Sequence, residues 1–527
     1  MNAGRGTLME SGGEGKALRR KKRRDMSWRD HLVMLLSFGA AAEHCLMVEY
    51  LYAAYSLRPD ERDPEKRKMI EGWRAQILAV AREEMGHLLT VQNVLCLLGA
   101  PMALGRDDSL WAHKYYPYEF SLKPFSLETL TYFVFAEMED KPIDAFEADE
   151  RPLLHKIVDA AKTRGDAHHV GDLYTDIVAI MSDPDLIPDS DFDELSFERQ
   201  FSWDEWGRNY RPAPYELDAA GNRVLSDTTN AKTKTDGEKT DAKAKMRRAA
   251  HLEVPRVASR TDAVRALVQL LAQGEVPHIE RAVAPTLRSK SKRRGEPSHF
   301  DRFFTIYKEF LEEREKDENW SPAAGVCTDP TTRKEFAQET RGAPRPLTPI
   351  KAIAARRLAQ VFNQRYRLLL AYLAHAFRIG RTARLDRPNL RALLMHRAFG
   401  EMYNLKTLAG MLVRLPRLDE RDDPAIKDPW AGPPFELPYS TELPDADADV
   451  WRMHKDVLET SRATCRDLLS AAHAPAPELG ERSKQVKAQL DGVGAEAYLR
   501  TLMELDGQAL QWIDGILGNQ RSGGGGQ

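Results

Sequence analysis

The chain has 527 residues, of which 42% are hydrophobic and 30% are charged, and its formal net charge is −3. This balance is typical of a soluble globular protein and gives no reason to expect nucleic acid or an acidic partner. The four cysteines include no pair at C-x-x-C spacing, which argues against a disulfide framework or a zinc knuckle and favours a reducing, cytoplasmic location. No uninterrupted apolar stretch reaches the ~20 residues that span a bilayer, so we expect no membrane contact.

The first 26 residues are expected to form a disordered basic tail. They contain the basic run Arg19–Arg24 after a Gly-rich start, and no apolar segment of the kind found in secretory signals follows. Such a tail can bind nucleic acid or anionic lipid, but a solvated tail is the simpler interpretation. We therefore expect no specific nucleic-acid partner.

A first helix is expected over residues 27–56, and it carries Glu43 in an otherwise apolar run. An unpaired carboxylate would be costly to bury there, so burial of Glu43 would require a proton or a cation. His44 and Glu49 are competing ligands on other sides of the helix. We interpret His44 as a packed or surface histidine.

A second helix is expected over residues 65–98, with Glu84 and His87 three residues apart on one face. A solvated glutamate beside a half-buried histidine is one interpretation of this pair. The charged, proline-bounded segment 58–64 predicts a turn, and the midpoint of Glu43 and Glu84 falls inside it. Two antiparallel helices would therefore bring Glu43 level with Glu84 and His87. This arrangement is half of a carboxylate-bridged dinuclear site in a four-helix bundle.

Two further helical runs follow. The third is expected from Leu127 to about Phe146, and it carries Glu137 directly after an apolar stretch. The fourth follows Pro152 and continues to Met181. Three polar residues either contribute to a site at the start of this helix or form a polar helix entry with Asp172 on the surface: His168, His169 and Asp172.

The segment near 183–256 is expected to be a flexible insertion, because much of it is polar and repetitive. Helices are then expected over residues 261–273, from Ser298 as an N-cap onward, and over 347–377, 388–415 and 481–517. The scattered histidines of the last third are interpreted as structural or exposed: His375, His396, His454 and His473. The chain end is expected to be disordered.

Several separated motifs share the order of a known family. They are Glu43 with Tyr50–Ala53, Glu83–Leu88, Gln273–Glu275, Ser298–Phe303 and Ala431–Glu436. Together they resemble the iminophenylpyruvate-dimer synthase family, which includes the imine-dimer-coupling enzymes of violacein, rebeccamycin and staurosporine biosynthesis. The resemblance covers about residues 28–469. Asp172 and Val276 depart from the family pattern, which bears on the substrate pocket.

The resemblance implies an all-α fold with a ferritin-like four-helix bundle core and additional C-terminal helices. The domain organisation expected is a bundle over 27–310, a helical extension over 311–470 packed on it, and a C-terminal helix with a disordered tail over 471–527. The metal ligands that the resemblance implies are Glu43, Glu84, His87, Glu137, Glu275 and His299.

Carboxylate and imidazole ligands without thiolate suit non-haem iron, mononuclear or dinuclear, or manganese, and spacing alone leaves zinc open. The implied function is that of a non-haem metal-dependent oxidase or oxidative coupling enzyme that acts on an amino-acid-derived small molecule in natural-product biosynthesis. The alternative is a non-catalytic metal-binding or scaffold protein. An open metal position beside a lined pocket would favour the enzyme. A homo-oligomer is compatible with either function.

Overall fold

The computed structural model describes most of the chain. The described residues are 26–58, 61–106, 118, 120–138, 142–162, 170–202, 215–217, 223–225, 254–274, 297–323, 325–333, 347–379, 390–418, 428–437, 441–473 and 480–523. The basic tail, His168, His169, Glu275 and the last four residues lie outside them, so the expectations that concern these residues stay predictions.

The fold is built around an antiparallel pair of long helices, α1 (Trp28–Ser56) and α2 (Pro64–Leu97). The Ser27 side chain caps α1 by accepting from the backbone N–H of Asp30. Asp63 caps α2 in the same way, and Pro64 takes the first helical position, where its missing N–H costs nothing. Gly99 ends the helix at φ 61°. The predicted hairpin is therefore confirmed to within one residue.

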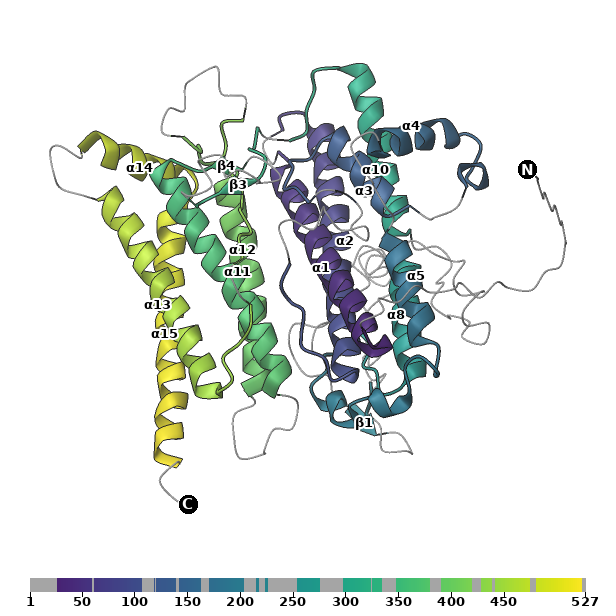
Figure 1. The fold of residues 1–527 in the computed structure, drawn as a ribbon. Coiled ribbons are helices and arrows are strands. Elements are labelled where there is room, and N and C mark those ends of the chain that lie inside the picture. Colours follow the sequence, from purple (N-terminus) through teal and green to yellow (C-terminus); the bar gives the residue numbers. More distant parts are fainter. Residues whose placement is uncertain are drawn as a thin grey trace, which may run out of the picture.

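The other two positions of the bundle are each shared by two shorter helices. The half of the α1–α2 pair that includes the hairpin turn packs against α3 (Leu127–Ala136) and α10 (His299–Lys316), and α4 (Arg151–Lys162) packs on α3. The opposite half packs against α5 (Val170–Met181) and α8 (Arg260–Gly274). In Figure 1, α3 and α10 lie above α5 and α8 beside the long pair. The boundary between α3 and α5 and the boundary between α8 and α10 both lie at the level of the candidate ligands.

The third helix differs from the expectation that it runs to about Phe146. It ends at Ala136, and Glu137 is its C-cap with φ −92° and ψ 1°. A short 3₁₀ helix, η2 (Ile143–Ala145), follows Pro142, a residue that cannot continue an α-helix. Ending the helix at Glu137 leaves the Glu137 side chain buried against α10 rather than on a solvent-facing turn.

The start of the expected insertion is part of the packed structure. It contains the 3₁₀ helices η3 (Asp189–Asp191) and η4 (Glu194–Glu198). The Asn93 side chain of α2 donates to the carbonyls of Phe201 and Pro255 at 2.8 and 2.9 Å, so both ends of the segment are tied to α2. Within the segment, β1 (Tyr215–Leu217) pairs antiparallel with β2 (Arg223–Leu225).

A second group of helices lies beside the bundle around α1 and α2 in Figure 1, coloured green to yellow. It comprises α11 (Ile353–Ile379), α12 (Leu390–Leu412), α13 (Asp447–Ala472), α14 (Gly480–Gly492) and α15 (Ala495–Gly523). The apolar periodicity of the sequence did not predict α13 as a separate helix. The short parallel pair β3 (Pro330–Thr331) and β4 (Thr348–Pro349) lies near the top of this group. One continuous hydrophobic core joins α1, α5 and α8 to α11–α15.

The predominance of helices confirms the all-α fold class. By length and composition, α1 could cross a membrane, which the expectation of no such stretch did not anticipate. However, 72% of its most apolar window is buried inside the structure, as in the central helix of a bundle.

Candidate metal centre

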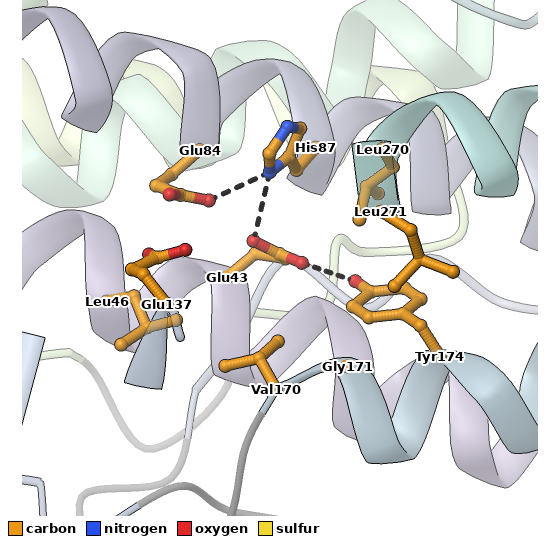
Figure 2. Close-up of a pocket in the computed structure, with 10 residues that line it drawn as sticks. All are labelled: Glu43, Leu46, Glu84, His87, Glu137, Val170, Gly171, Tyr174, Leu270 and Leu271. Atoms are coloured by element: carbon orange, nitrogen blue, oxygen red, sulfur yellow. Dashed lines mark hydrogen bonds and ion pairs between the residues drawn. The ribbon is translucent and has the colours of Figure 1, made fainter. Parts of the chain in front are cut away.

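Glu43, Glu84 and His87 come together where α1 crosses the middle of α2. The Nδ1 atom of His87 lies 2.9 Å from Oε2 of Glu84 and 3.5 Å from Oε2 of Glu43. All three side chains are buried. Figure 2 shows both carboxylates directed at the imidazole. The turn-midpoint argument therefore placed these residues correctly, because both helices are long and uninterrupted.

A second triad shares Glu84 with the first. The Nδ1 atom of His299 lies 2.9 Å from Oε1 of Glu84 and 3.4 Å from Oε2 of Glu137. His299 is the first residue of α10, whose capping box of Ser298 and Asp301 fixes the start of the helix. The potential ligand atoms within each triad lie within 4.8 Å of one another. Glu84 thus presents one oxygen to each histidine.

Five of the six residues expected as ligands therefore converge, and Glu275 lies outside the described residues. Among the other candidates, Asp172 is exposed on the first turn of α5. His44 is fully buried, points away from the centre and bonds the Tyr366 hydroxyl of α11. Its expected packing role fits this position.

The sequence did not predict in detail which residues contact the candidate ligands from outside the centre. The Nε2 atom of His299 lies 2.8 Å from Glu83, and Arg302 donates to both oxygens of Glu83 at 3.1 and 3.0 Å. The hydroxyl of Tyr174 donates to Glu43, and that of Tyr50 donates to Glu137, each at 2.5 Å. Tyr50 could have been identified, since it follows Glu43 by two helical turns. No local pattern points to Tyr174, which approaches from another helix.

The electrostatics of the cluster explain what it could bind. Burial, followed by Glu84, raises the pKa of Glu43 to about 8. Burial alone would lower the pKa of His87, but Glu84 and Glu43 outweigh it and raise this pKa to about 10. Burial likewise opposes ionisation of Glu84, but His299 and His87 hold its pKa well below the usual range. In the absence of a cation, the cluster must therefore hold protons to offset its buried carboxylates.

The side chains of the two triads are better arranged to bind a metal ion than to form hydrogen bonds with one another. Oε1 of Glu84 and Nδ1 of His299 are buried and close, yet neither makes an aligned hydrogen bond among the described residues. Because His299 is paired with Glu83 through Nε2, its Nδ1 lone pair is available to a cation in the centre. Two Glu₂His sets that share one carboxylate could hold two ions bridged by Glu84. Oxygen and nitrogen donors without sulfur suit iron or manganese.

A small cavity borders the first triad and also reaches Glu137 of the second. Its volume is about 20 Å³, and its lining includes Glu43, Glu84, His87, Glu137 and Tyr174. The remaining lining residues come mainly from the start of α5 and the end of α8: Val170, Gly171, Leu270 and Leu271, with Leu46 of α1. The cavity is therefore lined both by the polar candidate ligands and by aliphatic residues of α1, α5 and α8 (Figure 2).

Comparison with known proteins agrees with this fold. Residues 36–205 match the family model described as Ferritin-like. The chain is 26% identical to dichlorochromopyrrolate synthase of Lentzea aerocolonigenes over 446 residues, which cover 78% of this chain and 36% of the relative. It is 33% identical to 2-imino-3-(indol-3-yl)propanoate dimerase of Chromobacterium violaceum over 115 residues, which cover 18% of this chain and 11% of the relative. No solved structure matches.

The chain thus corresponds to only part of these longer relatives, with 36% of the synthase and 11% of the dimerase matched. One relative is named as a synthase and the other as a dimerase, and the ferritin-like match contains the segment that carries Glu43, Glu84, His87 and Glu137. Residues 36–205 are therefore ferritin-like, and the chain is similar to part of these two enzymes, in agreement with its motifs.

Proposed function

We propose that this protein is a metal-dependent oxidative coupling enzyme that acts on an imine derived from an aromatic amino acid. The observation that carries the proposal is the pair of buried Glu₂His triads that share Glu84. A cluster of this composition is costly to bury without cations and has no evident structural use in a helical core.

The donor set determines how the ions would be held. Glu84 would contribute to both positions, Glu43 and His87 to one of them, and Glu137 and His299 to the other. Iron or manganese held in this way would supply reaction with a two-electron oxidant such as dioxygen or peroxide. The aliphatic walls of the cavity would exclude bulk water from the first position.

The relatives support the choice of substrate class. One is named as a dimerase of 2-imino-3-(indol-3-yl)propanoate and the other as dichlorochromopyrrolate synthase. Joining two imine molecules through a new bond, with loss of one hydrogen atom from each, releases two electrons and two protons. Reduction of hydrogen peroxide to two water molecules, or of dioxygen to hydrogen peroxide, would take up the same two electrons and two protons.

The size of the cavity limits what can reach the ions directly. A volume of about 20 Å³ accepts one water-sized molecule. Pockets for organic ligands usually measure roughly 300 to 1,000 Å³. We therefore assign the cavity to the small oxidant rather than to the organic substrate. The presence of a cavity lined by the candidate ligands favours an enzyme over a closed structural site.

Metal content and imine coupling together test the proposal. The parent, Glu84→Ala and a control, Glu71→Ala, would be purified without a metal-binding tag, loaded anaerobically with Fe(II) or Mn(II), and measured by plasma mass spectrometry. Glu71 is exposed on the same helix. We expect about two equivalents of metal in the parent and in the control, and a loss of both in Glu84→Ala, because Glu84 belongs to both triads.

Coupling would be measured on imines of tryptophan, phenylalanine and tyrosine formed in situ by an amino-acid oxidase. The expected product has twice the mass of the imine less two hydrogen atoms, and it forms with the parent and with Glu71→Ala. A parent that holds no metal after anaerobic loading would overturn the metal centre. A metal-loaded parent that couples none of the imines would overturn the reaction.

A further inference from the structure

Tyr174 has an unusual position for a tyrosine of a helical core. It is fully buried on α5, and its hydroxyl donates to Oε1 of Glu43 at 2.5 Å. The other carboxylate oxygen of Glu43 faces His87. The phenol therefore holds the Glu43 carboxylate in one rotation, with Oε2 directed into the first triad, as Figure 2 shows.

A glycine in the interior of α1 makes this approach possible. Gly39 lies one turn before Glu43, and a Cβ atom placed on it would lie 3.1 Å from the Tyr174 hydroxyl oxygen and 3.3 Å from its Cζ. Glycine inside a helix costs roughly 0.5–1 kcal/mol relative to alanine. The next three residues are alanines, so the helix otherwise uses the residue that favours it most. Gly39 therefore makes α1 less stable than alanine would, but it leaves space for the Tyr174 ring.

The second triad has a matching tyrosine with different surroundings. The Tyr50 hydroxyl donates to Oε1 of Glu137 at 2.5 Å. Its ring packs against Phe133 and Phe303, with ring centroids 4.6 and 4.8 Å away. Tyr174 lines the cavity, whereas Tyr50 is not among the described residues that line it. The same hydrogen bond therefore occurs once beside the cavity and once within an aromatic cluster.

We propose that Tyr174 and Gly39 are positioning residues for the metal position formed by Glu43, Glu84 and His87, and that they set its affinity independently of the second position. This inference rests on the metal centre of the proposed function. Without the hydroxyl, Oε1 of Glu43 loses its donor, and the carboxylate can turn toward the cavity. The metal position formed by Glu43, Glu84 and His87 is then the one that changes.

Four single variants separate this role from a general loss of packing. Tyr174→Phe removes only the hydroxyl, and Tyr50→Phe makes the same change at the second triad. Gly39→Ala displaces the ring, whereas Gly72→Ala on α2 has no atom within 4 Å of the added Cβ and serves as its control. Each protein would be titrated anaerobically with Mn(II) by calorimetry, and its unfolding temperature would be measured without metal.

We expect Tyr174→Phe to bind one of two equivalents 10- to 100-fold more weakly and to bind the other as the parent does, the usual size of an outer-partner effect. Gly39→Ala should weaken that same equivalent, Tyr50→Phe the other, and Gly72→Ala neither. Azide added to the Fe(III)-loaded proteins should change the visible spectrum more in Tyr174→Phe than in Tyr50→Phe, because Tyr174 lines the cavity itself, whereas Tyr50 contacts a lining residue, Glu137.

The outcomes distinguish this inference from the proposed function. A parent that binds no Mn(II) or Fe(II) overturns both. A parent that binds two equivalents while Tyr174→Phe binds both unchanged overturns the positioning role and leaves the metal centre in place. Equal weakening of the same equivalent by Tyr174→Phe and Tyr50→Phe overturns the independence of the two positions. If Gly39→Ala does not fold, the Tyr174→Phe result decides.

Discussion

Two adjacent glutamates of α2 have different partners. Glu84 faces both candidate histidine ligands, whereas Glu83 lies against the outer nitrogen of His299 and accepts from Arg302. The Glu83–His299 contact favours a proton on Nε2, which leaves the Nδ1 lone pair directed into the centre. The pair Glu83–Glu84 therefore combines a ligand position with the support of a ligand on another helix.

Replacing Glu83 by glutamine tests this support. Glu83→Gln keeps the size of the side chain but weakens its acceptance from His299 Nε2, so the imidazole becomes a poorer and less oriented ligand. We expect Mn(II) affinity to fall 10- to 100-fold. Titration calorimetry measures the change, with the exposed Glu71→Gln on the same helix as control. Unchanged affinity in Glu83→Gln would show that His299 is held by other contacts.

The sequence alone could predict the relative positions of those candidate ligands that lie on long, uninterrupted helices. Glu43, Glu84 and His87 were found because two long helices and a short turn fix their relative height. Glu137 and His299 depended on the family resemblance, since each sits at the end of a helix whose position is set by distant packing. Tyr174 was missed because its contact with Glu43 spans 131 residues.

Among the elements, the breaks between α3 and α5 and between α8 and α10 are the least predictable features. Apolar periodicity continues past Ala136 in the sequence, yet α3 ends there with Glu137 as its C-cap. Periodicity reports which face of a segment is buried but not where tertiary contacts end the helix. The split leaves Glu137 and His299 at helix ends, within 3.4 Å of each other.

The packing of α11 against α13 contains a buried histidine pair. The Nδ1 atom of His375 lies 3.0 Å from Nε2 of His454. Burial, followed by Arg378, lowers the pKa of His375 to about 3, and burial, followed by His375, lowers that of His454 well below its usual range. Asp447, 3.9 Å from His375, is half exposed and does not offset the burial. Both imidazoles are therefore neutral in the folded protein at neutral pH.

This pair predicts a loss of stability in acid. Because the folded state depresses these pKa values, the unfolded chain binds more protons below its own histidine pKa of about 6.5. The contribution to stability is complete above that pH and is lost as the pH falls toward about 3. At pH 4.5, His375 alone should cost about 2 to 3 kcal/mol.

Urea unfolding at pH 7.5 and pH 4.5 checks this expectation. His375→Gln replaces the imidazole by a neutral hydrogen-bonding side chain, so the variant should lose about 2 to 3 kcal/mol less than the parent between the two pH values. His396→Gln, at an exposed position on α12, should behave as the parent does. Equal acid losses in the parent and in His375→Gln would assign the effect to other groups.

Over the whole molecule, one hydrophobic core joins α1, α2, α5 and α8 to the C-terminal helices. Polar contacts cross the same junction, where His44 of α1 bonds Tyr366 of α11 and Arg106 donates to the carbonyl of Phe435. Phe435 itself packs edge-on against Phe362 and Tyr366. A core without a boundary at the junction predicts that both halves unfold in one cooperative transition.

A variant in the C-terminal half provides the test, because its effect should reach α2. Arg365 of α11 is buried and bonds Glu401, Ser461 and Asp506, which lie on α12, α13 and α15. Arg365→Ala leaves two buried carboxylates without their cation and should cost about 3–5 kcal/mol. The exposed Arg367→Ala, two residues along the same helix, is the control. Ser461→Ala provides a milder change if Arg365→Ala does not fold.

Native-state hydrogen exchange followed by mass spectrometry measures the protection of backbone amides in both halves of the protein in one experiment. If the core is one cooperative unit, the slowest amides of α2 should lose as much protection in Arg365→Ala as those of α13, since both then exchange only by global unfolding. Loss of protection confined to α11–α15 would show that the halves open separately, with the junction at His44 and Tyr366 too weak to couple them. In that case, a variant in the C-terminal helices would not destabilise the helices that carry the candidate metal centre. A shared loss of protection would instead show that the stability of α1 and α2, and with it the arrangement of Glu43 and Glu84, depends on the C-terminal helices. Those helices contribute no candidate ligand among the described residues.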